Sequence, residues 1–312
     1  MANKLKIEAQ LAIRRAAAKI LGDYVPSTLT YGEDLHQELE AAAARTTVDG
    51  EWAALAAEIG AALKRDGVDK FLRLAPIAKT VHPRIRSAGR RYLAYLARSE
   101  RFSTRIQQAL SESPVGMPLV NPHYPFSSPV LVQHGYHLVR LLESTDIDLS
   151  KLRLVVDFGG GYGSFYRLLR NLGYRDSYLI CDLPVMCALQ RFYLRNVFPT
   201  GPETQAPENL RWQSQDVAET LKRETVGRSP SLFVATWSLS ETPLSVRAEI
   251  APTLAGFDYV LCAYQRAFGP HDNVQYFTSL EKMLPQFSWQ HTECSVYRNN
   301  FYLIGQKHKA RD

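Results

Sequence analysis

A short apolar segment that runs into a dense glycine turn sets the strongest limit on how this chain can fold. Residues 154–158 read Leu-Val-Val-Asp-Phe, and residues 159–163 read Gly-Gly-Gly-Tyr-Gly. The first segment predicts a buried strand, and the second predicts a turn whose glycines allow positive φ and a close approach of the backbone to a ligand. A helix that follows such a turn points its free N–H groups into the same space. We therefore expect a small polar cofactor here.

The details of the turn indicate which cofactor to expect. A dinucleotide fingerprint places a third glycine or an alanine where this chain has Ser164. Asp157 stands where a carboxylate would repel a pyrophosphate but would attract the ammonium or sulfonium group of S-adenosylmethionine, SAM below. A second apolar segment, 178–181, ends at Asp182, about twenty residues past the glycines, where a carboxylate can accept both hydrogen bonds of a ribose diol. The spacing therefore favours SAM over NAD.

Strand and helix patterns alternate from residue 151 to the end of the sequence, which is typical of a parallel sheet covered by helices. A short third strand leads to Asp216, a candidate acceptor for the adenine amino group. The last two strands lie on either side of Arg298-Asn299-Asn300 and predict a hairpin. The fold class we expect is α/β, a seven-stranded Rossmann-like sheet, mostly parallel with an antiparallel C-terminal hairpin, after an all-helical N-terminal region. The predicted strands are 154–158, 178–181, 210–213, 232–236, 258–264, 288–297 and 300–306.

The first part of the chain predicts only helices. We expect a helical region over 1–112, a proline-rich loop and connecting helix over 113–150, and the SAM-binding domain over 151–312. The helical region is expected to form a lid or acceptor-side wall over the pocket and to carry a homodimer contact, because the sheet domain by itself has no evident cover. Helices are predicted over 3–21, 33–45, 51–65, 68–79 and 85–111, and again over 129–145.

The positive charge is concentrated in this helical region. The chain carries a formal net charge of +6, and the first 110 residues hold 18 Lys and Arg against 12 Asp and Glu. Arg84, Arg91, Arg98 and Arg105 recur every seven residues, which on one continuous helix places them on one face. A helix face exposed to solvent explains this pattern. The alternative is a face that binds an anionic substrate, a carrier phosphate or a nucleic acid.

Composition places the chain among ordinary globular proteins. It has 312 residues, 46% hydrophobic and 22% charged, and no apolar run approaches the roughly 18 residues of a membrane span. Four cysteines show neither metal-ligand nor redox spacing, which predicts buried, reduced thiols. The Ala-, Lys- and Arg-rich start of the chain contains Glu8 and lacks a cleavage-like site, so it predicts a helix of the mature protein. We therefore expect a cytoplasmic protein with no membrane contact.

Two groups of histidines flank the predicted pocket. His123 and Tyr124 lie in the proline-rich loop, and His134 and His137 stand one turn apart on the next helix. The element Asn121-Pro122-His123-Tyr124 resembles the Asn-Pro-Pro-Tyr element of amino-methylating enzymes, but that element belongs after the fourth strand, which another segment already occupies. We expect the loop to lie at the pocket mouth, with His123, Tyr124 and His134 as candidate substrate contacts. No carboxylate cluster accompanies the histidines, so no metal is expected.

Three motifs together resemble a known family. They are Asp157-Phe158-Gly159-Gly160-Gly161-Tyr162-Gly163, then Cys181-Asp182-Leu183-Pro184 with Gln190-Arg191-Phe192-Tyr193-Leu194, then Ser238-Leu239-Ser240-Glu241. Over roughly residues 120–306 they resemble the sugar O-methyltransferases of bacterial polysaccharide and natural-product clusters. The resemblance implies SAM as cofactor, a sugar hydroxyl as acceptor and a seven-stranded methyltransferase sheet. The cofactor contacts expected are Asp157, Phe158, Gly159, Gly160, Gly161, Tyr162, Gly163, Asp182, Leu183, Asp216, Val217, Thr236 and Trp237.

The glycine turn and Asp182-Leu183-Pro184 also resemble the O-methyltransferases of plant phenolics and bacterial polyketides. Those enzymes carry a catalytic histidine two residues before a tryptophan, where this chain has Ala235 before Trp237. The departure counts against their mechanism. Methylation of RNA is a second alternative, motivated by the arginine face, although no RNA-binding module is evident. A SAM-binding regulator or an inactive partner subunit is the third.

The acceptor proton requires a base near the ends of the fourth and fifth strands. A sugar hydroxyl is a poor nucleophile near neutral pH, so a positioned side chain must accept its proton. His271 follows the fifth strand and titrates in the right range, and Glu241 follows the fourth. We expect His271 to be the proton acceptor, with Glu241 as its partner or as a sugar ligand and Ser240 as a further substrate contact. The alternative is that Glu241 is only a charge at the start of a helix and that His271 is only a solvated turn residue.

Overall fold

The structure is a computed structural model, and it describes residues 32–45, 51–81, 88–121, 123–198 and 207–309. The predicted helix 3–21 lies outside these residues. The chain divides into two compact units, each built from several segments. Unit 1 is 1–136, 161–168 and 183–207, and unit 2 is 137–160, 169–182 and 208–312. These units do not follow the expected boundaries after residues 112 and 150, and that division of the chain stays a prediction.

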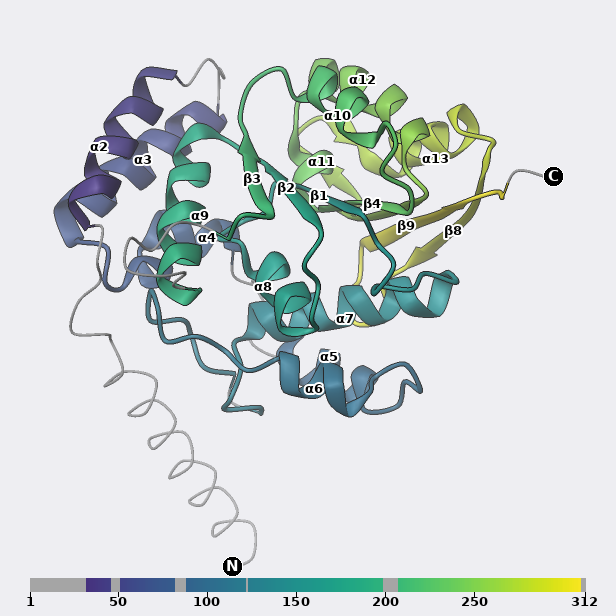
Figure 1. Cartoon of the computed structure of the whole chain (residues 1–312), viewed down its shortest axis with the longest axis horizontal. Coiled ribbons are helices and arrows are strands. Elements are labelled where there is room, and N and C mark those ends of the chain that lie inside the picture. The colour runs from purple at the N-terminus through teal and green to yellow at the C-terminus, as the bar shows by residue number, and fades with distance from the viewer. Residues whose placement is uncertain (1–31, 46–50, 82–87, 122, 199–206, 310–312) are drawn as a thin grey trace, which may run out of the picture. The chain divides into compact units, whose positions relative to one another are not determined.

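A seven-stranded sheet forms the centre of unit 2 (Figure 1). Its strand order is β3-β2-β1-β4-β5-β9-β8, in which β9 pairs antiparallel with both β5 and β8 and the other neighbours pair parallel. The expected fold class is therefore confirmed, including the C-terminal hairpin. The strands are β1 (Leu154–Phe158), β2 (Ser177–Cys181), β3 (Leu210–Gln213), β4 (Ser231–Thr236), β5 (Tyr259–Gln265), β8 (Phe287–Glu293) and β9 (Asn300–Lys307).

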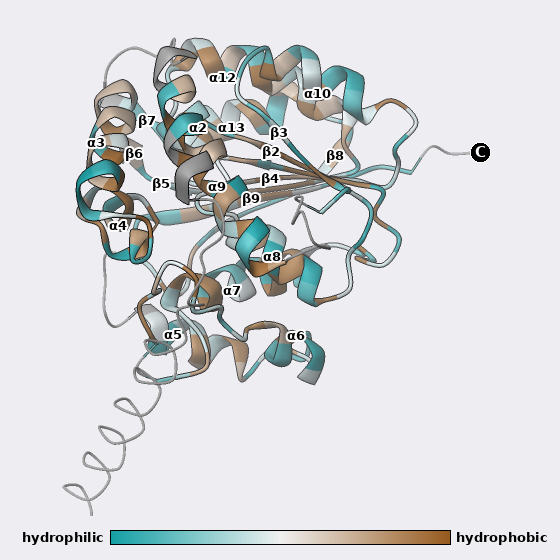
Figure 2. Ribbon diagram, turned by 60° about the vertical axis from the view of Figure 1, so that its left-hand side comes forward, coloured by the Kyte–Doolittle hydropathy of each residue, from teal (hydrophilic) through white to brown (hydrophobic). Residues whose placement is uncertain are grey.

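Helices α10 (Val217–Thr225), α12 (Leu244–Ile250) and α13 (Asn273–Met283) cover one face of this sheet. Alternate strand residues such as Val156, Phe233 and Val260 pack against them in one apolar cluster. Figure 2 shows hydrophobic residues along the central strands between the covering helices. β1 is buried along its whole length, which is why it reads as a continuous apolar run rather than as an alternation.

The opposite face of the sheet meets the second half of α7 (Pro129–Ser144). His137 on this helix contacts Tyr302 of β9, and Arg140 donates to Thr292 of β8 at 3.2 Å. The remaining elements of unit 2 are short: α11 (Ser238–Glu241), the 3-10 helix η2 (Ala251–Gly256), and a small hairpin of β6 (Ala267–Phe268) and β7 (His271–Asp272). α8 (Ser164–Asn171) passes from unit 1 into unit 2 along the chain.

Unit 1 is helical in its described part. α2 and α3 confirm the helices predicted over 33–45 and 51–65, and both pack against α9. Pro184 occupies the first turn of α9, where a missing N–H leaves no bond unmade. The helices are α2 (Gly32–Arg45), α3 (Glu51–Asp66), the 3-10 helix η1 (Phe71–Arg73), α4 (Ala75–Val81), α5 (Ala88–Leu96), α6 (Thr104–Ala109) and α9 (Pro184–Val197).

The long helix predicted over 85–111 is wrong. Its described part contains two short helices, α5 and α6, with turns between them. Two serines explain the break, because their side chains offer the backbone alternative partners: Ser99 Oγ accepts the N–H of Arg101, and Ser103 Oγ caps α6 by accepting the N–H of Ile106. Arg91, Arg98 and Arg105 therefore do not share one helix face. Residue 84 lies outside the described residues.

Other local expectations have mixed outcomes. The helix predicted over 68–79 is replaced by η1 and α4, while the helix over 129–145 is confirmed as α7. All four cysteines are buried free thiols, as the sequence predicts. No helix within the described ranges combines the length and apolarity needed to cross a membrane.

Candidate functional site

Parallel pairing brings the ends of β1, β2 and β3 to one edge of the sheet. Phe158 pairs with Cys181, and Cys181 pairs with Gln213, so the residues that follow these strands come out side by side. Asp182 continues the alignment, because its N–H donates to the carbonyl of Gln213 at 3.1 Å. In open α/β sheets, ligands bind outside this carboxyl edge, where the strand order reverses. Here the order reverses at β1, between β2 and β4.

The first two glycines of the turn are required by packing in unit 2. Gly159 has φ +73°, and a Cβ there would lie 2.1 Å from the Cβ of Ser238, which follows β4. Ser238 Oγ also donates to the carbonyl of Phe158. A Cβ on Gly160 would lie 2.8 Å from Ile180 of β2. These glycines let the strand ends approach closely. Ser238 joins the turn to the end of β4. The sequence indicated this residue only as part of the third motif.

The third glycine is different. Gly161 belongs to unit 1, has φ +58°, and a Cβ there would meet only Val81 at an ordinary 3.7 Å. Gln190 of α9, fully buried, donates from Nε2 to the carbonyl of Gly161 at 2.8 Å. The turn is therefore held open rather than filled at this position. A backbone that is fixed, in the left-handed region and free of a neighbouring side chain is what a closely approaching ligand needs.

Asp157 does not face the solvent at the sheet edge. It is 2% exposed, and its Oδ2 accepts a hydrogen bond from Tyr178 of β2 at 2.8 Å. Burial raises the pKa of Asp157 to about 7, although the tyrosine hydrogen bond opposes the shift. A direct attraction between this carboxylate and a cofactor cation, as the sequence suggested, requires an accessible group. The geometry instead gives Asp157 a place inside the sheet, next to the turn that follows it.

The other predicted cofactor residues of unit 2 lie at the carboxyl edge. Asp182 is half-buried directly after β2, and Asp216 is exposed after β3 with φ +48°, at the start of α10 where Val217 begins the helix. Thr236 is the last residue of β4 and is half-buried. In unit 1, Leu183 is the residue directly before α9, and its side chain makes no capping hydrogen bond. These positions match the expected order of carboxylates along the edge. Their contact with a cofactor stays a prediction.

Trp237 adopts an unusual conformation at the end of β4. Its φ is +66°, which is rare for a bulky residue and requires support from its surroundings. The support comes from two sides: the indole Nε1 donates to Asn300 Oδ1 at 2.7 Å, and the backbone N–H donates to the carbonyl of Ala263 at 2.6 Å. The ring also stands edge-on to His137, whose Nδ1 lies 2.5 Å from the hydroxyl of Tyr302. Strain of this kind gathers at functional sites.

Glu241 lies in a polar network that the sequence did not predict. Gln265, the last residue of β5, donates from Nε2 to Glu241 Oε1 at 3.1 Å, and its Oε1 accepts from Ser240 Oγ at 3.0 Å. Ser240 is fully buried, so its role as a substrate contact would require its backbone or a rearranged side chain. β4 and β5 are neighbours in the sheet, which explains why residues 24 positions apart meet.

His271 occupies the small hairpin that follows β5. It pairs with Phe268 and is half-buried, and the next residue, Asp272, caps α13 by accepting the N–H of Gln275 at 3.1 Å. α11, which ends at Glu241, contacts β6 of the same hairpin. Glu241 and His271 therefore belong to adjoining elements after β4 and β5, as expected. Their catalytic roles stay predictions.

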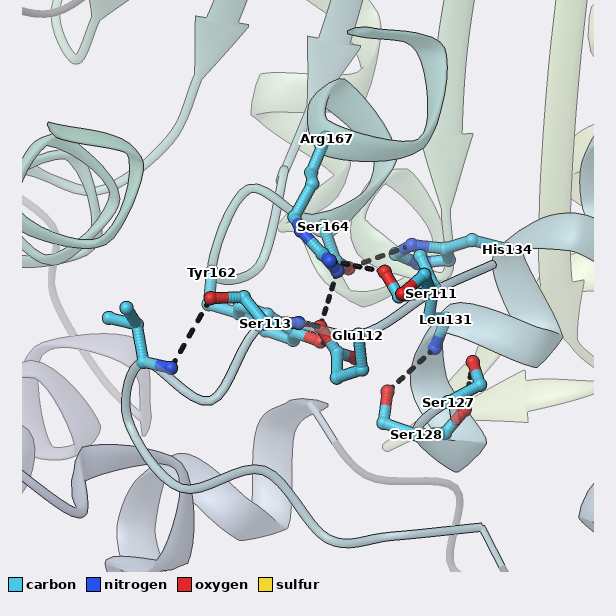
Figure 3. A network of polar contacts seen from close by, with 11 residues as sticks. Ser111, Glu112, Ser113, Ser127, Ser128, Leu131, His134, Tyr162, Ser164 and Arg167 are labelled. Carbon is cyan, nitrogen blue, oxygen red and sulfur yellow. Dashed lines mark hydrogen bonds and ion pairs between the residues drawn. The ribbon is translucent and has the colours of Figure 1, made fainter. Parts of the chain in front are cut away.

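Unit 1 contains a second buried polar network, around Tyr162 of the glycine turn (Figure 3). Arg167 Nη1 lies 2.5 Å from Glu112 Oε1, with both side chains almost fully buried, and Arg167 Nη2 donates to the carbonyl of Ser111. Tyr162 donates to Glu112 Oε2 at 3.4 Å, and its ring stands edge-on to Tyr193. The residues directly before the proline-rich loop are thus bound to α8, the helix after the turn. No local sequence pattern could predict this ion pair, because Glu112 and Arg167 are 55 positions apart.

His134 joins the same helix from α7. Its Nδ1 lies 2.8 Å from Ser164 Oγ, at the first residue of α8 (Figure 3). Its ring stands edge-on to Phe165. Burial lowers the pKa of His134 to about 4. The imidazole is therefore neutral at physiological pH and supports the start of α8. A role in binding substrate stays a prediction.

The Asn121–Tyr124 element forms a turn of its own loop. Asn121 is fully buried, and its Oδ1 accepts the N–H of His123 at 2.9 Å. Tyr124 donates to the carbonyl of Gln107 on α6 at 3.3 Å, while His123 is exposed. An asparagine that serves its own turn in this way is not placed to grip a planar nitrogen. The arrangement counts against the amino-methylating interpretation.

Two further features of the described residues concern ligand binding. No group of three or more His, Cys, Asp and Glu side chains among them could hold a metal ion. An apolar groove of about 340 Å³ lies on unit 1, and no predicted site residue lines it. It is lined by Leu39, Ala53, Ala56, Ala57, Gly60, Ala61, Lys64 and Val185.

Comparison with known proteins gives structural similarity only. No protein-family model matches the sequence, and no curated protein matches it. Among solved structures, "PigF with SAH" has a TM-score of 0.37 at 14% identity over 56% of this chain and 59% of that one. The methyltransferase domain of bacterial CtHen1 has a TM-score of 0.41 at 13% identity over 56% and 97% of the two chains.

A third structure of this kind comes from Synechocystis PCC 6803. It is magnesium protoporphyrin IX methyltransferase with bound SAM, with a TM-score of 0.40 at 18% identity over 56% of this chain and 80% of that one. The names of these proteins indicate that they differ in what they act on. Identities and TM-scores this low carry no argument about the cofactor, the substrate or the mechanism of this chain.

Proposed function

We propose that the protein is a SAM-dependent O-methyltransferase whose acceptor is a hydroxyl group of a sugar or of a glycosylated small molecule. The observation that carries the proposal is the carboxyl edge of the sheet. There, a glycine turn follows β1, Asp182 follows β2 and Asp216 follows β3, in neighbouring positions. An adenosyl cofactor needs a close backbone, an acceptor for its ribose diol and an acceptor for its adenine, in that order along an edge.

The residues present fit this cofactor. Gly161 keeps positive φ and an open Cβ position, with its carbonyl fixed by Gln190, so the backbone there can approach a ligand closely. Asp182 and Asp216 are at least partly accessible, whereas Asp157 is buried and supports the turn from inside. When bound, SAM supplies an electrophilic methyl group. We assign its ribose to Asp182 and its adenine edge to Asp216 and Val217.

The chain's own contribution to the reaction is to bind the acceptor and to take up its proton. Glu241 follows β4, which is the neighbour of the strand that carries the glycine turn, and His271 follows β5, the next strand along. We assign His271 as the base that accepts the hydroxyl proton, and Glu241 as its partner or as a sugar ligand. The sugar itself is supported by the resemblance of the three sequence motifs to sugar O-methyltransferases.

Transfer of a labelled methyl group from SAM tests the function. A panel of free and nucleotide-linked sugars, a panel of phenols and bulk RNA should be offered to the full chain. The proposal expects label only in the sugar panel. Label in RNA or phenols alone would replace the proposed substrate class. SAM binding by calorimetry without transfer to any acceptor would favour a regulator or an inactive partner subunit.

The proton acceptor is tested by pH-rate profiles of His271→Gln and Glu241→Gln, with SAM affinity measured separately. We expect His271→Gln to abolish the acid limb of the profile and Glu241→Gln to lower turnover. Wild-type turnover in both variants would show that the base lies elsewhere, with His123 and His134 next to be tested.

Deletion of residues 1–110 tests the lid or wall that the N-terminal helices are expected to form. Full activity of the truncated protein would contradict this role.

A further inference from the structure

Arg247 of α12 is fully buried and forms hydrogen bonds to the backbone on both sides of Glu241. Its Nη2 donates to the carbonyl of Ser240 at 2.6 Å, and its Nε donates to the carbonyl of Thr242 at 2.8 Å. These are the two residues next to Glu241 in the sequence. A planar guanidinium can hold two carbonyls in fixed directions, which an ammonium group cannot do. The backbone of Glu241 is thus fixed from both ends by one side chain.

A second arm of the same guanidinium is connected to the Glu241 carboxylate only indirectly, through Asn273 and then through the backbone and side chain of Gln265. Arg247 Nη1 donates to Asn273 Oδ1 at 2.8 Å, and Asn273 Nδ2 donates to the carbonyl of Gln265 at 2.9 Å. Gln265 in turn donates to Glu241 Oε1 at 3.1 Å and accepts from Ser240 at 3.0 Å. The hydrogen bonds close a ring that starts at Arg247 and returns to Ser240 and Glu241. Backbone and carboxylate are held by one connected network.

The charge of Arg247 has no acidic partner in the described part of the chain. Its guanidinium contacts carbonyls, an amide and the face of Tyr276, whose ring centroid lies 5.0 Å from Cζ. Burial lowers the pKa of Arg247. A buried charge is costly unless hydrogen bonds compensate it. Here the compensating bonds go to the carbonyls on both sides of Glu241 and to Asn273, so the guanidinium fixes these groups in place.

We propose that Arg247 is a positioning residue, which holds the carboxylate of Glu241 in the orientation that the acceptor site requires. This inference rests on the proposed function, because it concerns the acceptor side of the same site. Arg247 is fully buried and bonds to the 240–242 segment and to Asn273, so it would act on Glu241 only through these groups and Gln265. Its effect should therefore fall on turnover and on acceptor KM, and leave SAM affinity unchanged.

A double-mutant cycle separates positioning from general stability. We expect Arg247→Met to lower kcat at least tenfold, Arg247→Lys to lower it less, and both to keep the SAM Kd within twofold. In a Glu241→Gln background, Arg247→Met should lower kcat by less than twofold, because the group that it positions has already been lost. Arg153→Met, at the opposite end of β1, is the matched control and should leave kcat unchanged. A full tenfold loss in both backgrounds would overturn the proposal.

Hydrogen exchange tests the same inference without any acceptor. In the folded full chain, amides of residues 240–242 should exchange at least tenfold faster in Arg247→Met than in the wild type, and not faster in Arg153→Met. Unchanged exchange would overturn the inference even if sugar methylation is demonstrated. Faster exchange would support it even if the substrate class proves wrong. If Arg247→Met does not fold, Gln265→Met removes only the side-chain bonds from Gln265 to Glu241 and Ser240 and leaves the bonds of Arg247 and Asn273 in place. It should still lower kcat, and wild-type kcat there would count against the network.

Discussion

Arg167 in unit 1 and Arg247 in unit 2 are both withdrawn from solvent, but the described residues give only Arg167 a carboxylate. Arg167 pairs with Glu112. Burial alone would lower the pKa of Arg167, but the neighbouring Tyr193, Glu112 and Tyr162 raise it. Arg247 meets backbone carbonyls, Asn273 and an aromatic ring, and burial lowers its pKa. The first arginine joins two segments through a charge pair, whereas the second fixes the course of one loop.

This difference predicts that the two regions respond differently to substitution. A charge pair that loses one member leaves the other buried and uncompensated, which is among the most damaging changes to a folded protein. A guanidinium bound to carbonyls leaves neutral groups behind when it is removed. Substitutions in unit 1 should therefore lower stability most, and substitutions at the edge of unit 2 should lower catalytic activity most.

The largest effect is expected for Glu112→Gln. The free energy of unfolding should fall by about 3–5 kcal/mol, because Arg167 keeps its charge without a carboxylate. Chemical denaturation of the full chain measures it. Asp148→Asn, which removes an exposed pair with Lys151, is the control and should leave the midpoint unchanged. An unchanged midpoint for Glu112→Gln would mean that the pair contributes no more than a surface pair.

Arg247→Met should cost less, about 2–3 kcal/mol, because the carbonyls and the amide that it leaves are neutral. The same denaturation series measures this value, and Arg153→Met again serves as the control. A loss larger than that of Glu112→Gln would reverse the comparison. It would show that the loop around Glu241 carries more of the fold than the buried ion pair does.

Asp182→Ala should separate chemistry from stability at the edge of unit 2. A charged acceptor that a ribose diol loses is worth about 1.5–3 kcal/mol per bond, so SAM should bind tenfold or more weakly. The midpoint of unfolding should not change, because Asp182 is only half-buried. Calorimetry with SAM measures the affinity, and Asp176→Asn, before β2, is the matched control. Unchanged affinity would remove Asp182 from the cofactor site.

The smallest effects concern two titratable groups, one in each unit, whose pKa values are shifted by desolvation in opposite directions. The pKa of Asp157 is raised to about 7, so its contribution to stability is present at low pH and is lost as the pH rises from about 4 to 7. The pKa of His134 is lowered from 6.5 to about 4, so its contribution is present above pH 6.5 and is lost as the pH falls towards 4.

Single substitutions should reveal each contribution. Across the shared range, each group changes the unfolding free energy by up to about 1.4 kcal/mol per pH unit, and the two slopes oppose one another in the wild type. Asp157→Asn should leave a stability that rises with pH between 4 and 6.5, and His134→Gln one that falls. Denaturation at several pH values measures both. If neither variant changes the slope, these groups titrate alike in the folded and unfolded chain.

Much of the fold follows from local patterns in the sequence. The segments that form β1, β2, β4 and β5 are short, apolar, separated by turn residues and buried along most of their length, so the strands at the centre of the sheet and the fold class were predicted correctly. β3 and β8 are mostly half-buried or exposed, and turn residues between the last two segments predicted the hairpin. The helix over 85–111 failed for a reason that was also local: Ser99 and Ser103 bond to nearby backbone N–H groups, and these bonds outweighed an apolar spacing that continued through the break.

The candidate site divides in the same way. The sequence by itself determined that Asp182, Asp216, Glu241 and His271 follow strands, and parallel strands bring their carboxyl ends to one edge whatever the side chains do. Only the tertiary structure decided that Asp157 turns towards Tyr178 and that Ser238 closes on Gly159. It also decided that Arg247 holds both sides of Glu241. These contacts join residues far apart in the sequence, and their geometry depends on how the strands and helices pack, so no local spacing could reveal them.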